Sequence, residues 1–372
     1  MKKVLSVIAL TLVIVFALSA VPFTADKLFT PATEAAAEED GVLLTLELWS
    51  DTHIGSSNAL HFLENGVEVL NSESKHADGI IVSGDLSNGG YADEYRDFYN
   101  TMAKVEGSKV VTANGNHDYG QTKSHEERRP VAIRYRNECV GVDSNKDYYS
   151  TDIKGYKVIV LGDEGTKPNS AVISDAQLTW LGEELAEGAK DGKPCFVVCH
   201  WPLKGDHGEW FLWPIIPGGH IDSASTRKIR SMMEHYSNVF FISGHLHAGL
   251  NGAFARRFFN SGCVKEKNGV TYISVPSFGQ GNRFGIRDKG TGMHVTLTKD
   301  KLLIEGKNYL TGRTYDGYVY EIGVNNYNPE TDTTPADPVD PVTPENPDSP
   351  DTVNLPDETV IPESADNKQE AA

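Results

Sequence analysis

The chain has 372 residues, of which 39% are hydrophobic and 23% are charged, so it is long enough for one large domain or two modest ones. Its formal net charge of −18 argues against nucleic acid as a docked partner, because proteins hold phosphate backbones with clusters of Lys and Arg. The composition favours a folded, soluble protein without stable nucleic-acid binding.

The first 25 residues have the pattern of a secretory signal peptide. Two lysines precede an apolar run that ends near Val21, and small residues suited to cleavage lie at its end, at Ala20, and behind it, at Ala25 and Ala37. Because the run approaches the roughly 20 residues that span a bilayer, an uncleaved membrane anchor is the alternative. We expect a secreted, extracellular protein in which residues 26–41 form a linker.

Within the central part of the chain, residues 42–325, short apolar runs alternate with helical patterns. Strands are predicted at 43–49, 79–85, 108–115, 156–163, 194–200 and 239–245, because these near-continuous apolar runs are typical of strands buried on both faces. Helices are predicted at 57–72, 91–104, 130–139, 174–190 and 223–236. Ser174 and Gln177 form a predicted capping box for the fourth of these. The pattern favours one α/β domain with two sheets packed face to face and helices outside.

After residue 253 the helical patterns become rare. β-rich runs follow one another at 254–260, 270–276, 293–299, 301–310 and 318–324, and they suggest antiparallel strands.

The last segment, residues 326–372, is predicted to be a disordered acidic tail. From Pro329 to the last residue it holds nine prolines, twelve acidic residues and one lysine, a net charge of −11. Such a segment cannot bury enough apolar surface to offset the entropy of ordering. A cell-surface spacer and a solubilising tail fit equally well, so membrane or cell-wall association through the tail or an uncleaved N-terminus stays open.

The four cysteines do not resemble a secreted disulfide framework. Cys195 and Cys199 lie about 13 Å apart along an extended chain, which is too far for a bridge. Buried free thiols are expected, with Cys139 and Cys263 as the other two.

Polar residues follow five of the predicted strands at the point where each ends. They are Asp51 and His53, Asp85, the run Asn116, His117 and Asp118, then His200, and finally His245 and His247. Because the carboxyl ends of neighbouring strands meet at one edge of an α/β sheet, we expect these side chains to converge on one crevice. Gly84, Gly115 and Gly244 each precede one of them and let the backbone bend sharply. Each stretch alone is also an ordinary turn sequence; the five together predict a metal site.

The blocks DTH, GDLSN, GNHD, VVCH and GHLH, in this order, resemble the calcineurin-like metallophosphoesterase family over Leu43 to about Gly279. The resemblance implies a four-layer α-β-β-α sandwich of two mixed sheets flanked by helices, with a two-metal site. It implies that one metal is held by Asp51, His53 and His247, that the other is held by Asn116, His200 and His245, and that Asp85 bridges both.

The chemistry of these residue types agrees with that implication. Two cations about 3.5 to 4 Å apart can share a hydroxide for in-line attack on phosphorus. Histidine, Asp and Asn donors suit Mn, Fe or Zn. His117 is left to protonate the leaving oxygen or to stabilise charge on the phosphoryl group. Asp118 is predicted to fix the tautomer of His117, with a simple turn role as the alternative.

A long aromatic loop after His200 is the candidate for substrate selection. Trp201, His207 and Trp210 belong to it, and aromatic walls with a few polar groups are typical of ligand pockets. Packing of the loop itself is the alternative. Arg283 is a further candidate for phosphate contact. The expected partner is a small phosphate-ester substrate.

The sequence departs from the purple acid phosphatase branch, which has a tyrosine ligand where this chain has Asn88 and a glycine at the position of His53. It is closer to the branch with cyclic-nucleotide phosphodiesterases. We predict a secreted phosphatase or phosphodiesterase. A dinuclear amidase or peptidase and a non-catalytic cell-surface binding module are the alternatives.

Overall fold

The computed structural model describes residues 41–120, 125–165, 170–205, 219–250, 263–283 and 285–329. The predicted signal peptide and nearly all of the acidic tail lie outside these residues, and so does the predicted strand at 254–260. Among the helices of the described ranges, none has both the length and the apolar character needed to cross a membrane.

The first sheet has six strands in the order β14-β13-β12-β1-β2-β3. β1, β2 and β3 run parallel, whereas β12, β13 and β14 add antiparallel strands at the other edge. The bounds are β1 Val42–Trp49, β2 Gly79–Val82, β3 Lys109–Thr112, β12 Thr291–Thr298, β13 Lys301–Asn308 and β14 Arg313–Gly323.

The second sheet also has six strands, in the order β10-β11-β9-β7-β5-β4. Its four central strands are parallel and both edge strands are antiparallel, so this sheet is mixed as well. The bounds are β4 Tyr149–Ile153, β5 Tyr156–Val160, β7 Cys195–Val198, β9 Val239–Ser243, β10 Val264–Lys267 and β11 Val270–Ser274. A short parallel pair, β6 Ser170–Ala171 and β8 His220–Ile221, lies apart from both sheets.

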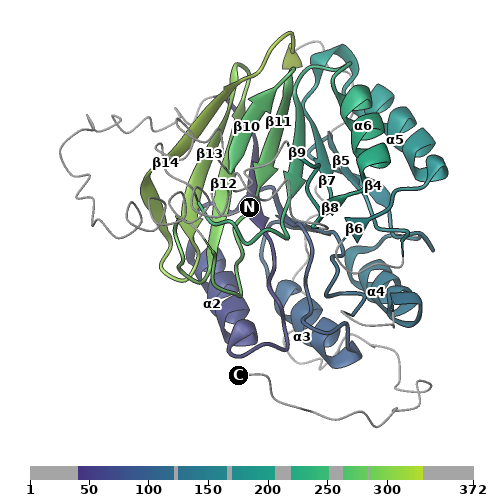
Figure 1. Cartoon of the computed structure of the whole chain (residues 1–372). Helices are drawn as coiled ribbons and strands as arrows, with labels where there is room; N and C mark the ends of the chain where they lie inside the picture. Colours follow the sequence, from purple (N-terminus) through teal and green to yellow (C-terminus); the bar gives the residue numbers. More distant parts are fainter. Residues whose placement is uncertain are drawn as a thin grey trace, which may run out of the picture. The chain divides into compact units, whose positions relative to one another are not determined.

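Helices cover the outer face of each sheet (Figure 1). α2 Ala59–Ser72, α3 Ala92–Met102 and α4 His125–Val140 form one group, while α5 Asp175–Gly188 and α6 Ser223–Met233 form the other, and the 3₁₀ turn η1 Lys190–Gly192 follows α5. The predicted four-layer α/β sandwich of two mixed sheets flanked by helices is therefore confirmed.

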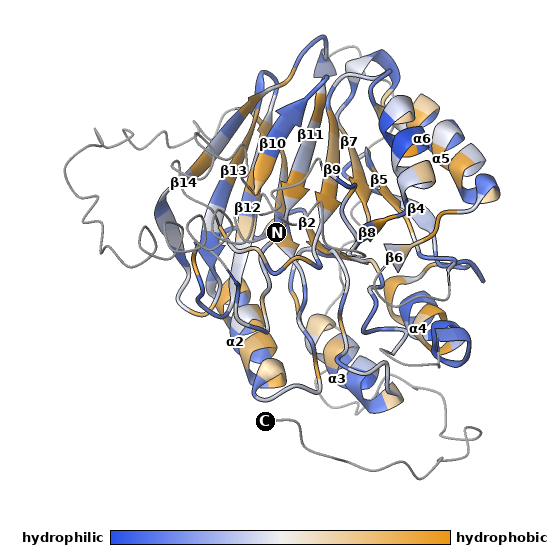
Figure 2. Ribbon diagram, in the orientation of Figure 1, coloured by the Kyte–Doolittle hydropathy of each residue, from blue (hydrophilic) through white to orange (hydrophobic). Residues whose placement is uncertain are grey.

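The alternation of side chains along the strands explains the layers. On β1, Leu44, Leu46 and Leu48 point into the apolar core between the two sheets, where they meet Phe196, Val198, Phe240 and Ile242 of the second sheet. The alternate residues pack under the helices in a second cluster, which includes Trp49, Ile80, Val197 and Phe241. Figure 2 shows the apolar colouring concentrated on central strands such as β7 and β9.

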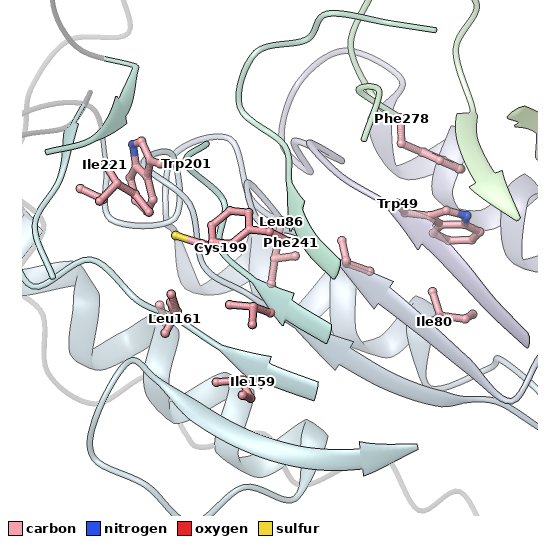
Figure 3. Packing of buried hydrophobic residues seen from close by; sticks show 14 of the residues in the cluster. Trp49, Ile80, Leu86, Ile159, Leu161, Cys199, Trp201, Ile221, Phe241 and Phe278 are labelled. Carbon is pink, nitrogen blue, oxygen red and sulfur yellow. The ribbon is translucent and has the colours of Figure 1, made fainter. Parts of the chain in front are cut away.

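The outer cluster continues into the loops at the strand ends. Trp49 packs on Phe278 with ring centroids 4.6 Å apart, and Trp201 lies beside Ile221 (Figure 3). These fully buried aromatic residues form a rigid support for the loops that carry the polar residues.

Two details of the predicted elements are wrong. β11 is antiparallel to β10 on one edge, but on its other edge it pairs parallel with β9, so it is not part of a purely antiparallel series. The capping box of α5 is only half formed: Ser174 Oγ accepts the N–H of Gln177, but the Gln177 side chain bonds to Gly162 instead. All four cysteines are free, as expected; Cys195, Cys199 and Cys263 are buried, whereas Cys139 is partly exposed.

Candidate metal centre

The polar residues that follow the five strands come together where the parallel strands of both sheets end. β1, β2 and β3 of the first sheet deliver Asp51, His53, Asp85 and Asn116, and β7 and β9 of the second sheet deliver His200, His245 and His247. The centre therefore lies at the junction of the two sheets, as expected for ligands at the carboxyl ends of strands.

The side chains form two groups that share one carboxylate. Ligand atoms of Asp51, His53, Asp85 and His247 all lie within 4.8 Å of one another, and so do those of Asp85, His200 and His245. Asn116 is buried beside them, and no described residue hydrogen-bonds to its Oδ1. For the carboxylates and histidines, this is the division into two ligand sets that the family resemblance implies, with Asp85 in both; membership of Asn116 in the second set stays a prediction.

Five of these residues adopt left-handed backbone conformations. Positive φ angles of 46° to 67° occur at Asp51, His53, Asp85, His245 and His247. Non-glycine residues rarely occupy this region, and each costs on the order of 1 to 3 kcal/mol. Their concentration at one place indicates that the surrounding structure holds these side chains in position for a function.

Backbone hydrogen bonds between loops maintain this geometry. The Asp51 N–H donates to the Gly84 carbonyl at 2.9 Å and the His53 N–H donates to the Asp85 carbonyl at 3.0 Å, so the first two loops are joined. Gly115 is required by close approach, because a Cβ there would lie 2.2 Å from Asp85 Oδ1.

Further hydrogen bonds aim individual ligand atoms at the centre. His200 Nδ1 lies 2.9 Å from the Ser83 carbonyl and donates to it, which places the lone pair on Nε2. Asp51 Oδ2 accepts from Ser50 Oγ at 2.6 Å and from the His245 N–H at 3.1 Å. Oδ1 of Asp51 is thereby directed at His247 Nε2, 3.0 Å away.

The donor set fits a pair of cations. Nε2 of His53 and Nε2 of His247 are 3.2 Å apart, and Nε2 of His200 lies 3.2 Å from Nδ1 of His245. Converging imidazole nitrogens, two carboxylates and an orphaned buried amide oxygen are the groups that a bound cation satisfies. The residues present therefore fit a dinuclear metal site.

The electrostatics favour the same occupant. Burial alone would raise the pKa of Asp51 and Asp85, but the neighbouring histidine charges, His247 for Asp51 and His200 for Asp85, hold both pKa values below the ordinary range. Burial lowers the pKa of His53 and of His245 to about 3, so both rings are neutral near pH 7. Ionised carboxylates and neutral imidazoles are the forms that bind metals.

His200 is the exception among the histidines. Burial would lower its pKa, but Asp85, with Oδ2 3.2 Å from Nε2, raises the pKa to about 9. A cation at this position competes directly with that proton.

His117 lies beside the first ligand group. The ring centroid of His117 is 4.4 Å from that of His53 at an interplanar angle of 88°, and the backbone N–H of His117 donates to Asp85 Oδ1 at 2.9 Å. Nδ1 lies 2.8 Å from the Asn88 carbonyl, which can only accept, so Nδ1 carries a proton and Nε2 is the nitrogen whose protonation can change.

The tautomer role predicted for Asp118 is wrong, because the Asn88 carbonyl makes that contact. The Asp118 carboxylate accepts hydrogen bonds from the N–H groups of Leu86, Ser87 and Gly115 and from Ser87 Oγ, at 2.7 to 3.2 Å. Burial and the nearby Asp85 raise its pKa to about 6. Asp118 joins the two loops that carry Asp85 and His117, which is the turn role named as the alternative.

The predicted substrate residues fall into three cases. Trp201 is fully buried, with its ring 5.2 Å from that of His200 and 6.0 Å from that of His245, so it supports the ligands from behind and offers no open wall. The Arg283 side chain is exposed, and the backbone N–H of Arg283 donates to the His247 carbonyl at 2.7 Å. His207 and Trp210 lie outside the described residues.

Several contributing residues escaped prediction because they act locally or through the backbone. Ser50, Ser83 and Asn88 orient Asp51, His200 and His117, the last two through carbonyl oxygens. Ser50 directly precedes Asp51 and Ser83 lies two residues before Asp85, so proximity in sequence is the only signal for them.

The comparisons with known proteins agree with this geometry. Residues 48–249 match the family model of calcineurin-like phosphoesterases. A probable cyclic nucleotide phosphodiesterase of Rhodococcus erythropolis is 29% identical over 165 residues, 41% of this chain and 50% of the relative. A cAMP/cGMP dual specificity phosphodiesterase of Mycobacterium tuberculosis is 27% identical over 232 residues, 58% of this chain and 64% of the relative. The chain therefore matches less than two thirds of the length of either.

Solved structures show the same fold at low sequence identity. A dimetal phosphatase from Danio rerio has a TM-score of 0.52 at 14% identity, with 77% of this chain and all of the other covered. A purple acid phosphatase from yellow lupin has a TM-score of 0.51 at 15% identity, with 75% of this chain and 53% of the other covered.

Proposed function

This chain belongs to the calcineurin-like phosphoesterase family, and from that premise we propose that it is a metal-dependent phosphodiesterase in which His117 protonates the leaving oxygen. The observation that carries the proposal is the pair of ligand groups that share Asp85, with His117 beside the first of them.

The residues divide the work by position. Cations held by the two ligand groups would supply Lewis acidity at the phosphoryl oxygens and a nucleophile at neutral pH. We propose that Asp85, which belongs to both groups, would hold both cations, and the nitrogen and oxygen donors, without a thiolate, favour Mn, Fe or Zn. The loops from the two sheets fix these donors before substrate arrives, so that little reorganisation remains for the reaction.

His117 supplies the proton. The contact from Nδ1 to the Asn88 carbonyl orients the ring, and Nε2 at the opposite end can deliver a proton to the oxygen that departs from phosphorus. An ester oxygen of high basicity leaves slowly without such help, so His117 matters most for poor leaving groups.

A diester substrate of the cyclic-nucleotide type is the proposed substrate class. Two observations support it: both relatives described above carry a cyclic-nucleotide phosphodiesterase name, and Asn88 occupies the position where purple acid phosphatases have a tyrosine ligand. We propose that Arg283, exposed beside His247, contacts a non-bridging phosphoryl oxygen. We also propose, from the N-terminal pattern, that the protein acts outside the cell.

The test combines activity with metal analysis. Purified protein reconstituted with Mn²⁺ should hydrolyse bis-p-nitrophenyl phosphate and cyclic AMP, and chelation should abolish both activities. Asp85→Ala should lose both metals, because this carboxylate belongs to both ligand groups. His117→Ala should keep its metal and lose about 10²- to 10⁴-fold in kcat. Asp93→Ala and His61→Ala, at exposed positions, are the matched controls.

The proposal fails if chelated protein keeps its activity. It also fails if Asp85→Ala retains both metals, or if p-nitrophenyl phosphate, a monoester, is consumed while every diester is left intact.

A further inference from the structure

We propose that Glu94 positions His117 for proton transfer, acting through the one peptide group that joins Asn88 to Gly89. The inference rests on the role of His117 proposed above. Glu94 is the third residue of α3 and is buried, with 9% of its surface exposed.

A single peptide group connects the carboxylate to the imidazole. Its carbonyl oxygen, on Asn88, lies 2.8 Å from His117 Nδ1 and accepts that proton. Its N–H, on Gly89, donates to Glu94 Oε2 at 2.8 Å. Because a peptide group is planar and rigid, the position of Glu94 sets the direction of the carbonyl that holds the ring.

Glu94 also contacts the loop that follows His53. A Cβ added to Gly55 would lie 2.0 Å from Glu94 Oε1, so this side chain fills the space that the glycine leaves. The same two loops are joined directly, since the Asn88 N–H donates to the Ile54 carbonyl at 2.8 Å. Glu94 therefore packs between the loop of a metal ligand and the loop that orients the proton donor.

The ring of His117 depends on this arrangement for its direction. The backbone of His117 is anchored at Asp85 Oδ1, and the hydrogen bond from Nδ1 to the Asn88 carbonyl restrains the tilt of the imidazole. A hydrogen bond accepted on the N–H side polarises the peptide group and strengthens the bond at its carbonyl side. A displacement of about 1 Å in a catalytic group can reduce the rate by up to about 10²-fold.

Glu94 has a second role that the test must separate from the first. It caps α3, because Oε2 also accepts the N–H of Tyr91 at 3.2 Å in a capping box. Capping explains the Tyr91 contact, but the Gly89 contact reaches beyond the helix to the peptide group that holds His117.

Leaving-group dependence distinguishes the two roles. The assay compares two phosphodiesters that differ only in the leaving group, phenol in one and p-nitrophenol in the other. p-Nitrophenolate is the weaker base and departs with little proton assistance. On the phenyl ester, kcat of E94A should fall about 10-fold or more below that of wild type. On the p-nitrophenyl ester, kcat of E94A should stay within about 3-fold of wild type. A variant that merely weakened the helix would lose equally on both. E94Q keeps a carbonyl oxygen for the same two N–H groups and should restore most of the phenyl-ester rate.

A double-mutant cycle with His117 tests whether Glu94 acts through it. In the H117A background, E94A should cause no further loss beyond about 2-fold, because the group that it positions is already absent. Metal content should stay at the wild-type level in both single variants. D93A, at the exposed neighbouring position, should match wild type on both esters. If E94A does not fold, E94D replaces it: its shorter side chain keeps a charge at the helix start and should still lose more on the phenyl ester.

The possible failures are distinguishable. If H117A itself shows equal losses on the two esters, the proton-donor role of His117 is wrong. If H117A discriminates between the esters but E94A and E94D do not, or if the losses of E94A and H117A multiply in the double variant, only the inference about Glu94 is overturned.

Discussion

Replacing Gly244 by alanine should disturb the metal centre without changing any ligand side chain. A Cβ at this position would lie 1.8 Å from Ser50 Oγ and 2.7 Å from Asp51 Oδ2, far inside the roughly 3.5 to 4.0 Å at which non-bonded atoms attract. Gly244 does not have a positive φ, so alanine adds no backbone strain and the effect is steric. Either the serine and the aspartate move or the strand end shifts.

The magnitude follows from the contacts that must break. Rotation of Ser50 removes the shortest overlap but ends its 2.6 Å hydrogen bond to Asp51, and a bond to a charged group contributes about 1.5 to 3 kcal/mol. The remaining overlap with Asp51 adds an overpacking penalty of about 1 to 3 kcal/mol. We expect the free energy of unfolding to fall by about 2 to 5 kcal/mol, and metal affinity to fall because Asp51 is a proposed ligand.

Urea unfolding of the metal-free protein, with metal content measured separately, tests this expectation. Gly323→Ala is the matched control, because a Cβ there would meet nothing within 4 Å. Adding Ser50→Ala to Gly244→Ala removes the atom that is overlapped most, so the double variant should be less destabilised than the two single losses together. Strictly additive losses, or a Gly244→Ala variant within about 0.5 kcal/mol of wild type, would refute the steric reasoning.

Two further outcomes are expected. Arg283→Met should raise KM several-fold with little change in kcat, because a phosphate contact made equally in ground and transition states contributes to binding alone; an unchanged KM in initial-rate kinetics would exclude that contact. Burial would lower the pKa of His294, but Glu47, 3.1 Å away, raises it above the usual 6.5. This pair should therefore stabilise the fold fully below pH 6.5 and less as the pH rises through the folded-state pKa of His294. In urea titrations, the free energy of unfolding of wild type should exceed that of His294→Gln at low pH, and this difference should shrink as the pH rises. A stability difference between wild type and His294→Gln that does not change with pH would contradict the raised pKa of His294.

The ligands of the metal centre could be predicted because their signal lies in residue type and order. Asp51, Asp85 and His200 each follow an apolar run that reads as a buried strand, and parallel strands bring their carboxyl ends to one edge. Burial on both faces makes such strands conspicuous. The alternation of Leu44, Leu46 and Leu48 then fixes which face of β1 meets the second sheet.

The orientation of the ligands could not be predicted, because it depends on contacts between loops that are distant in sequence. The left-handed conformations at Asp51 and His53 could not be predicted from residue type, because Asp and His adopt them more often than most residues but still only in a small minority of positions. Asp118 illustrates the limit: its identity suits a partner for His117, but the N–H groups of two loops reach its carboxylate instead. The sequence neighbour was therefore the wrong partner, and a backbone carbonyl was the right one.

The left-handed backbone residues and the carboxylate of Asp85, which both ligand groups share, lie at the same place in the fold. Five left-handed residues at on the order of 1 to 3 kcal/mol each amount to a penalty comparable with the whole stability of a domain. Relaxing any one of them would turn a ligand away from its group, so the apolar support under the loops, including Trp49 and Trp201, must resist that relaxation. Because Asp85 belongs to both groups and the histidines of those groups follow strands of both sheets, a cation pair bound there would tie the two sheets together at the edge that carries the left-handed residues. The chain thus concentrates its instability at the place where ligand binding can offset it.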